Sequence, residues 1–279
     1  MISCRYFDES FDTENCHNYI LSIQCSLNGF YFLVYDTISM KYVAYYEETI
    51  NCATPFQLKY EAELIIQKEE ALKKQYRKVN IEFKDTVEAL YPNSIVDLTD
   101  LPDVYELMTE KKNGYTVLRN EIIRGEISLA FSIPEIIIDF FKKEFPDCNF
   151  YSGGSYFLDF VFKEAGNNKV MALARSKNAL KASLTDGNKI LFFNNFYVKN
   201  DSDCLYYTLY IAKQLELEKN TEILLMGDMD AHGDFVSSLK NYFGKAHFAR
   251  INKSFSLSAS FMQKPDHYYL PLTQMSLCE

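Results

Sequence analysis

The densest group of side chains able to do chemistry lies in one short stretch of the second half of the chain. It reads Gly227-Asp228-Met229-Asp230-Ala231-His232-Gly233-Asp234 and follows an apolar run, 222–226, that predicts a buried strand. Carboxylates and an imidazole are ligands that a divalent metal accepts, and a bound metal can activate water for phosphoester cleavage. In this interpretation Asp228, Asp230 and His232 are the ligands of a metal-dependent phosphoesterase.

The same stretch also has a structural interpretation, which we favour. Asp and Gly are usual in a turn between a strand and a helix; Asp230 suits an N-cap, and Asp234 suits the positive end of a helix dipole. Phosphoesterases need further His and Asp motifs, and the chain has only His17, His247 and His267 besides. Neither His17 nor His267 has a ligand-spaced partner, so we expect both at surface or capping positions.

Composition excludes several classes of protein. The 279 residues are 48% hydrophobic and 24% charged, which is ordinary for a globular protein, and they suffice for two domains. The net charge of −9 argues against a broad surface for nucleic acid or anionic membrane. No apolar run reaches the roughly 18 residues that span a bilayer, and the first residues lack the order of a signal peptide. We therefore expect a cytoplasmic protein with no membrane insertion and no nucleic-acid partner.

The seven cysteines predict reduced thiols rather than disulfides or a zinc site. Their number is odd, no two form a C-x-x-C pair, and their spacing matches no zinc motif. In a reducing compartment such residues are commonly buried like small apolar side chains. The sequence also has no Walker A, G-x-S-x-G or Cys-His signature.

The elements that must position these residues follow a pattern that occurs twice. Each half begins with three short apolar strands joined by tight turns and continues with a helix. Apolar periodicity predicts strands at 18–25, 29–36 and 41–48 with a helix at 56–76, and strands at 169–175, 178–184 and 189–196 with a helix at 202–217.

Turn and cap residues support these boundaries. Asn28-Gly29 and Asp186-Gly187 predict hairpin turns, because these residues tolerate the positive φ of a tight turn. Thr54 as N-cap, Pro55 at the first helical position and Gln57 three residues after the cap predict the start of the first helix.

A hairpin followed by such a strand-and-helix unit resembles the ribonuclease H-like lobe, and two in tandem resemble the actin-like ATPase architecture. We therefore predict an α/β fold with mixed sheets and three parts. They are a first ribonuclease H-like lobe at 1–150, a second at 151–255, and a linker and C-terminal helix at 256–279 that pack back on the lobes.

Three short stretches carry a resemblance to a known family. They are Tyr19-Ile20-Leu21-Ser22-Ile23 with Asn28-Gly29-Phe30, Ile133-Pro134-Glu135, and the ending from Asp266-His267-Tyr268-Tyr269-Leu270 to Leu277-Cys278-Glu279. With them the chain resembles, over nearly its whole length, a bacterial family of proteins of unknown function whose fold is actin-like. More remotely it resembles the cytoplasmic actin-like proteins of type IV pilus and type II secretion machines. The resemblance implies a fold and brings no activity with it.

Actin-like ATPases place a D-x-G-[TS] turn in the first hairpin of each lobe. The Asp positions Mg²⁺, and the Gly lets backbone amides approach phosphate. The corresponding stretches here are Gln24-Cys25-Ser26-Leu27-Asn28-Gly29 and Arg175-Ser176-Lys177-Asn178, and neither contains the Asp. The adenosine position, Met226-Gly227-Asp228-Met229, keeps one Gly of the usual pair.

The nucleotide positions are therefore degenerate. Mg²⁺ requires anionic oxygen ligands, so we do not expect ATP or Mg²⁺ as a cofactor, although Arg175 and Lys177 can meet an anion. The positions that correspond to a nucleotide cleft are Asn28, Gly29, Arg175, Lys177, Gly227 and Asp228.

These observations favour a non-catalytic interaction or scaffold module with an unidentified protein partner, without catalytic residues and without a metal site. Two alternatives stay open. One is a nucleotide-binding protein with little hydrolysis, and the other is the metal-dependent phosphoesterase described above.

Overall fold

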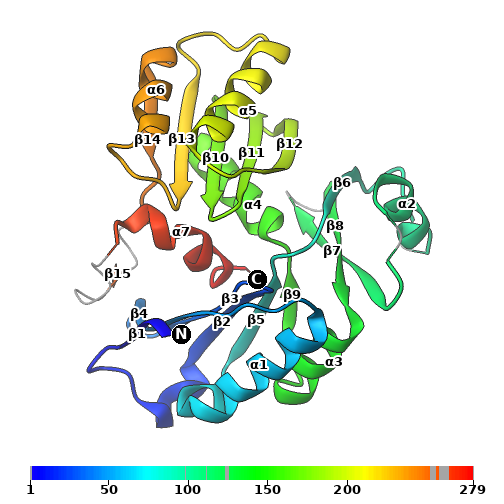
Figure 1. The fold of residues 1–279 in the computed structure, drawn as a ribbon, viewed down its shortest axis with the longest axis vertical. Coiled ribbons are helices and arrows are strands. Elements are labelled where there is room, and N and C mark those ends of the chain that lie inside the picture. The colour runs from blue at the N-terminus through cyan, green and yellow to red at the C-terminus, as the bar shows by residue number, and fades with distance from the viewer. Residues whose placement is uncertain are drawn as a thin grey trace. The chain divides into compact units, whose positions relative to one another are not determined.

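The computed structural model describes residues 2–97, 99–110, 112–122, 126–251, 256–257 and 264–278. The chain folds as two units. Unit 1 comprises Met1–Ser155, Asn252–Gln263 and Met275–Glu279, and unit 2 comprises Tyr156–Ile251 and Lys264–Gln274. Each unit contains a mixed β-sheet with helices, so the predicted α/β class is confirmed (Figure 1). Most of the predicted polar linker, 252–255 and 258–263, lies outside the described residues.

Unit 1 contains a large sheet and a smaller, three-stranded sheet. The large sheet has the order β1-β4-β3-β2-β5-β9, with β15 also pairing with β4, and the small sheet has the order β6-β8-β7. The strands are β1 (Ile2–Phe7), β2 (Tyr19–Ser26), β3 (Gly29–Asp36), β4 (Lys41–Thr49), β5 (Lys78–Phe83), β6 (Glu88–Pro92), β7 (Tyr115–Ile122), β8 (Ile127–Pro134), β9 (Asn149–Tyr151) and β15 (Ser256–Leu257). The helices are α1 (Pro55–Lys68), α2 (Leu101–Met108) and α3 (Glu135–Glu144), with short 3-10 helices at Thr13–Asn18 and Glu70–Lys73.

Unit 2 has a single five-stranded sheet of order β12-β11-β10-β13-β14. Its strands are β10 (Lys169–Ser176), β11 (Ala179–Asp186), β12 (Lys189–Tyr197), β13 (Glu222–Gly227) and β14 (Lys245–Phe248). The helices are α4 (Gly153–Ala165), whose first turn belongs to unit 1, α5 (Asp201–Gln214), α6 (Asp234–Tyr242) and α7 (Asp266–Met275). Within the described residues, no helix is long and apolar enough to cross a membrane.

The two sheets repeat one topology, as the sequence pattern predicts. In each, an antiparallel hairpin of three strands is followed by two parallel strands, so that β4-β3-β2-β5-β9 corresponds to β12-β11-β10-β13-β14. The correspondence extends to irregularities. The register shifts at Val43, the third residue of β4, and at Leu191, the third residue of β12. An extra residue in one strand bends it and increases its twist, so the two hairpins share that local shape.

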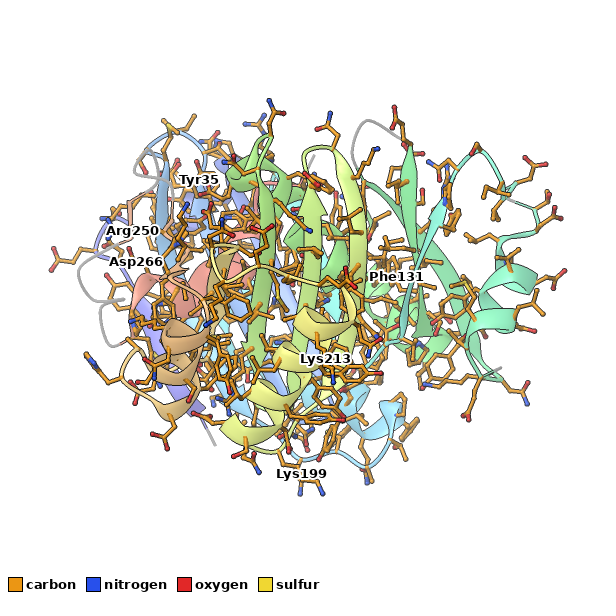
Figure 2. All side chains as sticks on the ribbon, turned by 90° about the horizontal axis from the view of Figure 1, so that it is seen from above. Tyr35, Phe131, Lys199, Lys213, Arg250 and Asp266 are labelled. Atoms are coloured by element: carbon orange, nitrogen blue, oxygen red, sulfur yellow. The ribbon has the colours of Figure 1, made fainter. Side chains whose placement is uncertain are left out.

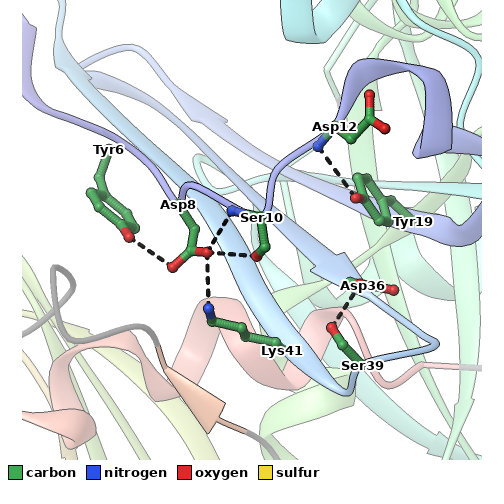
Figure 3. A network of polar contacts seen from close by, with 8 residues as sticks. All are labelled: Tyr6, Asp8, Ser10, Asp12, Tyr19, Asp36, Ser39 and Lys41. Carbon is green, nitrogen blue, oxygen red and sulfur yellow. Dashed lines mark hydrogen bonds and ion pairs between the residues drawn. The ribbon is translucent and has the colours of Figure 1, made fainter.

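Strand β1 is a feature that the apolar pattern did not predict. It pairs antiparallel with β4, from Arg5 opposite Tyr46 to Phe7 opposite Ala44. Where β1 ends, Asp8 accepts hydrogen bonds from the Ser10 N–H at 2.9 Å and from the Lys41 ammonium at 2.8 Å (Figure 3). The carboxylate therefore ties the chain that leaves β1 to the start of β4.

Local signals predicted the start of α1 correctly. Thr54 is the N-cap, and its hydroxyl accepts the Gln57 N–H at 3.3 Å. The Gln57 side chain reaches back to the N–H of Ala53 at 2.6 Å, one residue beyond the usual partner of a capping box. Gly187 has a φ of +54°, as expected for the second hairpin turn.

The end of the chain is anchored to the large sheet of unit 1. The Asn80 side chain donates to the Met275 carbonyl at 2.8 Å, and the Ser22 and Ser276 hydroxyls are 2.9 Å apart. Ser22 and Asn80 are paired neighbours on β2 and β5, so both point to the same face of the sheet. The residues after α7 therefore cover that face.

Candidate functional site

The turn that the sequence predicts as the first phosphate turn is occupied by the chain's own polar groups. It consists of Leu27 and Asn28, between β2 and β3. The Leu27 N–H donates to the carboxylate of Asp85 at 2.6 Å, and the Asn28 N–H donates to the Ser26 hydroxyl at 3.2 Å. Asp85 follows β5, 58 residues further along the chain. Both amides that would meet an anion at this turn are thus already bonded.

Gly29 has a different role from the predicted one. It is the first residue of β3, pairs with Ser26, and is not among the described residues with positive φ; nor is Asn28. The prediction that Asn28-Gly29 supplies positive φ is therefore wrong. A Cβ added at Gly29 would lie 2.7 Å from Cε2 of Tyr31, so the absence of a side chain makes room for that ring.

In unit 2 the corresponding turn is Lys177-Asn178, between β10 and β11, and Lys177 is exposed to solvent. Arg175, near the end of β10, forms an ion pair with Asp201, the first residue of α5. The Arg175 side chain is 17% exposed and that of Asp201 is 39% exposed. Burial acts to lower the pKa of Arg175, but the hydrogen bond and charge of Asp201 outweigh it and raise that pKa.

Asp201 also contacts a second helix. Its other carboxylate oxygen accepts the N–H of Phe235, in the first turn of α6, at 3.3 Å. Asp201 is not the N-cap of α5. That position is held by Asn200, whose side chain accepts the Asp203 N–H at 3.0 Å. Helix N-termini attract anions because their first N–H groups have no partner within the helix. A carboxylate of the chain therefore fills the anion position at the start of α6.

Gly227, at the predicted adenosine position, is required by the backbone. Its φ is +86°, and an added Cβ would lie 2.1 Å from the carbonyl oxygen of Arg175. The next residue, Asp228, donates its N–H to that same oxygen at 2.9 Å. Only glycine lets β13 end this close to β10.

The predicted metal ligands do not form a metal site. Asp230 uses its carboxylate to accept the His232 N–H at 2.9 Å. Within the described part of the chain, which includes all of 227–234, no three His, Cys, Asp or Glu side chains are grouped so that they could hold a metal ion. The N-cap of α6 is Gly233 rather than Asp230, so that part of the structural interpretation is wrong as well.

His267 is buried, contrary to the expectation of a surface or capping position. Its ring is stacked on Phe248 with centroids 4.0 Å apart, and its Nε2–H donates to the Met229 carbonyl at 3.1 Å. The residue is 6% exposed. It attaches the first turn of α7 to the loop that follows β13.

The sequence did not indicate that Asp85 bonds the Leu27 N–H or that Asp201 bonds Arg175 and the Phe235 N–H. Asp201 has the residue type of a helix cap, which hid its bond to a residue 34 positions away. Asp85 is one of many acidic residues in loops and has no motif around it. A contact between distant segments leaves no local signal, so only the folded chain reveals it.

The duplicated sheet with its crossovers and the turn after each first strand defines the actin-like class of fold. Within that class, the chain belongs to the DUF3822 family, described as proteins of unknown function, which it matches over residues 8–245. The predicted resemblance to such a family is confirmed. No curated protein matches the chain.

Solved structures with the same fold come from several systems. A Bacteroides thetaiotaomicron protein with actin-like ATPase fold and unknown function is 20% identical, with 96% of this chain and 99% of that chain covered and a TM-score of 0.79. A PilM–PilN type IV pilus biogenesis complex is 10% identical, with 92% and 97% covered and a TM-score of 0.58. Ethanolamine utilization protein EutJ from Carboxydothermus hydrogenoformans is 8% identical, with 93% and 89% covered and a TM-score of 0.52. These likenesses establish the fold.

Proposed function

We propose that this chain is a non-catalytic interaction module of actin-like fold, in which carboxylates of the chain itself occupy the first phosphate turn and the arginine beside the second. The observation that carries the proposal is a set of three bonds: Asp85 accepts the Leu27 N–H, and Asp201 bonds both Arg175 and the Phe235 N–H. Each bond uses an N–H or guanidinium group, the kinds of group that bind anions.

Electrostatics supports this proposal. A phosphate at either turn would come close to a fixed carboxylate, and two like charges about 4 Å apart repel by about 1 kcal/mol in water and about 4 kcal/mol at an effective dielectric constant of 20. Neither hairpin turn contains an Asp to hold Mg²⁺ beside that phosphate. Phosphate binding at either position would therefore require the carboxylate there to move.

The main alternative is nucleotide binding with little hydrolysis, and Arg175 is the observation in its favour. This guanidinium lies near the carboxyl end of β10, and ligands of α/β sheets commonly bind at such strand ends. An entering phosphate can replace Asp201 as the partner of Arg175. The phosphoesterase alternative has no such support, because its three ligands are not brought together.

The test measures thermal stability and phosphate release of the pure protein with ATP, ADP and Mg²⁺. We expect no saturable shift up to millimolar nucleotide and no release of phosphate above background. A saturable shift of several degrees without release would replace the proposal with the nucleotide-binding alternative.

Phosphate release that is lost in Arg175→Ala or Asp228→Ala would overturn the proposal outright. Lys219→Ala is the matched control, since Lys219 is an exposed basic residue of unit 2 in the turn before β13. A release that survives both site variants as well as the control would point to a contaminating enzyme, and the expectation of no intrinsic activity would then hold.

A further inference from the structure

The outer edge of β12 is open where the corresponding edge in unit 1 is covered. β4 and β12 occupy the same place in the two repeated sheets, have nine residues each and share the irregularity at the third residue. In unit 1, β1 and β15 pair with the outer side of β4. In unit 2, among the described residues, β12 pairs with β11 alone and forms the end of the sheet. This topology therefore accommodates a further strand at that position.

The side chains of β4 and β12 differ in burial in the same way as the two edges differ in cover. The five residues Tyr42–Tyr46 of β4 are all buried. In β12 no residue is fully buried, Leu191 is 46% exposed and Tyr197 is 66% exposed. A strand added at β12 would bury side chains whose counterparts in β4 are already buried.

The sequence of β12 lacks the usual protection of an edge. Proteins commonly prevent pairing at an exposed strand with charged residues or proline. Between Lys189 and Lys199, β12 and the residue after it contain neither. The stretch is instead rich in aromatic residues, with Phe192, Phe193 and Phe196 in the strand. Such a strand is suited to pairing with another extended segment.

The aromatic surface continues from the strand onto α5. Phe192 is stacked with Phe196 at a centroid distance of 6.3 Å, and Phe196 with Tyr207 at 4.5 Å. Tyr207 meets Tyr206 at 5.3 Å, and Tyr206 is stacked with Tyr210 at 6.1 Å. Tyr206 and Tyr210 are 62% and 50% exposed. Phe192, Phe196 and Tyr207 also pack against the core of unit 2, so the exposed Tyr206 and Tyr210 are the rings that offer a partner an amphipathic surface of the kind enriched in interfaces.

Charge indicates the chemistry of the partner. The β11–β12 hairpin and its flanks, 177–199, contain four lysines and one aspartate, a net charge of +3 in a chain of −9. Lys189, at the start of β12, is exposed, and so is Lys199, two residues after its end, which is labelled in Figure 2. Two copies of this edge would repel each other, whereas acidic residues at the ends of an incoming strand would meet both lysines.

From these observations we propose that the β12 edge binds an extended segment of a partner protein, with an uncharged apolar centre and acidic residues at its ends. The segment adds antiparallel to β12, as β1 adds to β4, and pairs with Phe192–Phe196, the residues that correspond to Ala44–Glu48. Main-chain hydrogen bonds supply affinity, and the lysines and aromatic rings select the sequence.

One side chain of the edge must adapt. Asn194 Oδ1 accepts the N–H of Asn195 at 2.8 Å. The incoming strand displaces this carboxamide or pairs on either side of it. Local bonds of this type compete with sheet pairing and are exchanged at small net cost. The proposal names the binding surface for the interaction role proposed above and rests on it.

The experiment sorts a display library of random twelve-residue peptides against the full-length protein and measures the enriched peptides in free form by fluorescence anisotropy. We expect proline-free, β-prone sequences with Asp or Glu at both ends. The variant Lys189→Glu/Lys199→Glu should weaken their binding at least about tenfold, since it turns two attractions into repulsions. The matched control Lys219→Glu/Lys245→Glu makes the same change of charge beside β14, the opposite edge, and should change binding less than about twofold.

Hydrogen exchange gives the second readout, because a strand added to β12 should slow exchange of its amides between residues 192 and 196. Failure to enrich any peptide, enrichment of basic or helical peptides, or equal effects of the two double variants would each overturn the proposal. So would concentration-dependent dimerisation through β12, or preferential binding of a twelve-nucleotide single-stranded DNA there. None of these outcomes depends on nucleotide turnover, so this test and that of the proposed function fail separately.

Discussion

Arg175 and Asp201 form an ion pair whose acidic member also accepts the N–H of Phe235. One carboxylate thereby connects the end of β10, the start of α5 and the start of α6. The free N–H groups at a helix N-terminus attract an anion, and at α6 the carboxylate of Asp201 takes that place. Here the chain provides the anion, so the arrangement contributes to stability without a ligand.

Replacement of Asp201 measures that contribution. Asp201→Ala removes the ion pair and leaves the Phe235 N–H without its acceptor, and we expect the free energy of unfolding to fall by about 1–2 kcal/mol. Urea denaturation monitored by circular dichroism provides the measurement. Ser202→Ala, at the next and exposed position of α5, is the control and should stay within about 0.5 kcal/mol of the original protein. Equal stability of the two variants would contradict a structural role for the pair.

Gly227 is expected to be the least replaceable glycine of unit 2. Gly227→Ala forces a Cβ to within 2.1 Å of the Arg175 carbonyl oxygen at a φ of +86°, so we expect a loss of more than about 3 kcal/mol or a failure to fold. Gly187→Ala is the matched control. It also has a positive φ, +54°, but nothing lies within 4 Å of its added Cβ, so it should cost only about 1–2 kcal/mol. Similar losses in both variants would mean that φ alone, and not the close approach of β13 to β10, requires Gly227.

The sequence predicted the repeated strands and the start of α1 because both depend on neighbouring residues. Short apolar runs bounded by turn residues mark β2, β3 and β4, and the Thr54 hydroxyl bonds a residue only three positions away. The bonds of Asp85 with Leu27 and of Asp201 with Phe235 join instead residues that are 58 and 34 positions apart. No periodicity or motif encodes such pairs.

Two further predictions failed, one for a local reason and one for a long-range reason. Asp230 has the residue type of an N-cap, but its carboxylate accepts the nearby N–H of His232, and α6 starts only at Asp234. Strand β1 was not predicted, because its cover on β4 depends on a partner strand about 40 residues away. The comparison between β4, which is covered by β1, and the open β12 therefore requires the structure.

Alkaline pH should destabilise the protein. Burial raises the pKa of the Cys148 thiol to about 11, partly offset by Lys142, and burial with the charge of Cys278 raises the pKa of Tyr151 to about 12. In the unfolded chain a thiol releases its proton near pH 8.5 and a phenol near pH 10. The unfolded state therefore loses protons first, so the stability present below about pH 8.5 is lost as pH rises through 11.

Urea denaturation at pH 7, 8, 9 and 10 tests this sign. Cys148→Ala should show a smaller fall in the free energy of unfolding above pH 8 than the original protein, while the two profiles run parallel below pH 7.5. Reaction of Cys25 with a thiol reagent at pH 8 should be slow in the folded protein, because the thiol is buried and burial raises its pKa, whereas all seven thiols should react in urea. A rise in stability between pH 8 and 10, or fast labelling of Cys25 in the folded protein, would contradict the assignment.

His267 should determine how firmly the first part of α7 is held in unit 2. His267→Ala removes the hydrogen bond to the Met229 carbonyl and the ring stacked on Phe248, and leaves a cavity at a buried position. We expect a loss of about 2 kcal/mol and faster hydrogen exchange at residues 266–270, with exchange in β10 and β13 little changed. The control is His247→Ala, which removes an exposed imidazole 3.5 Å from Glu222 and should change stability by less than about 0.5 kcal/mol. If His267→Ala leaves exchange in α7 unchanged, then the neighbouring buried residues Leu270 and Leu272 hold the helix and the imidazole does not.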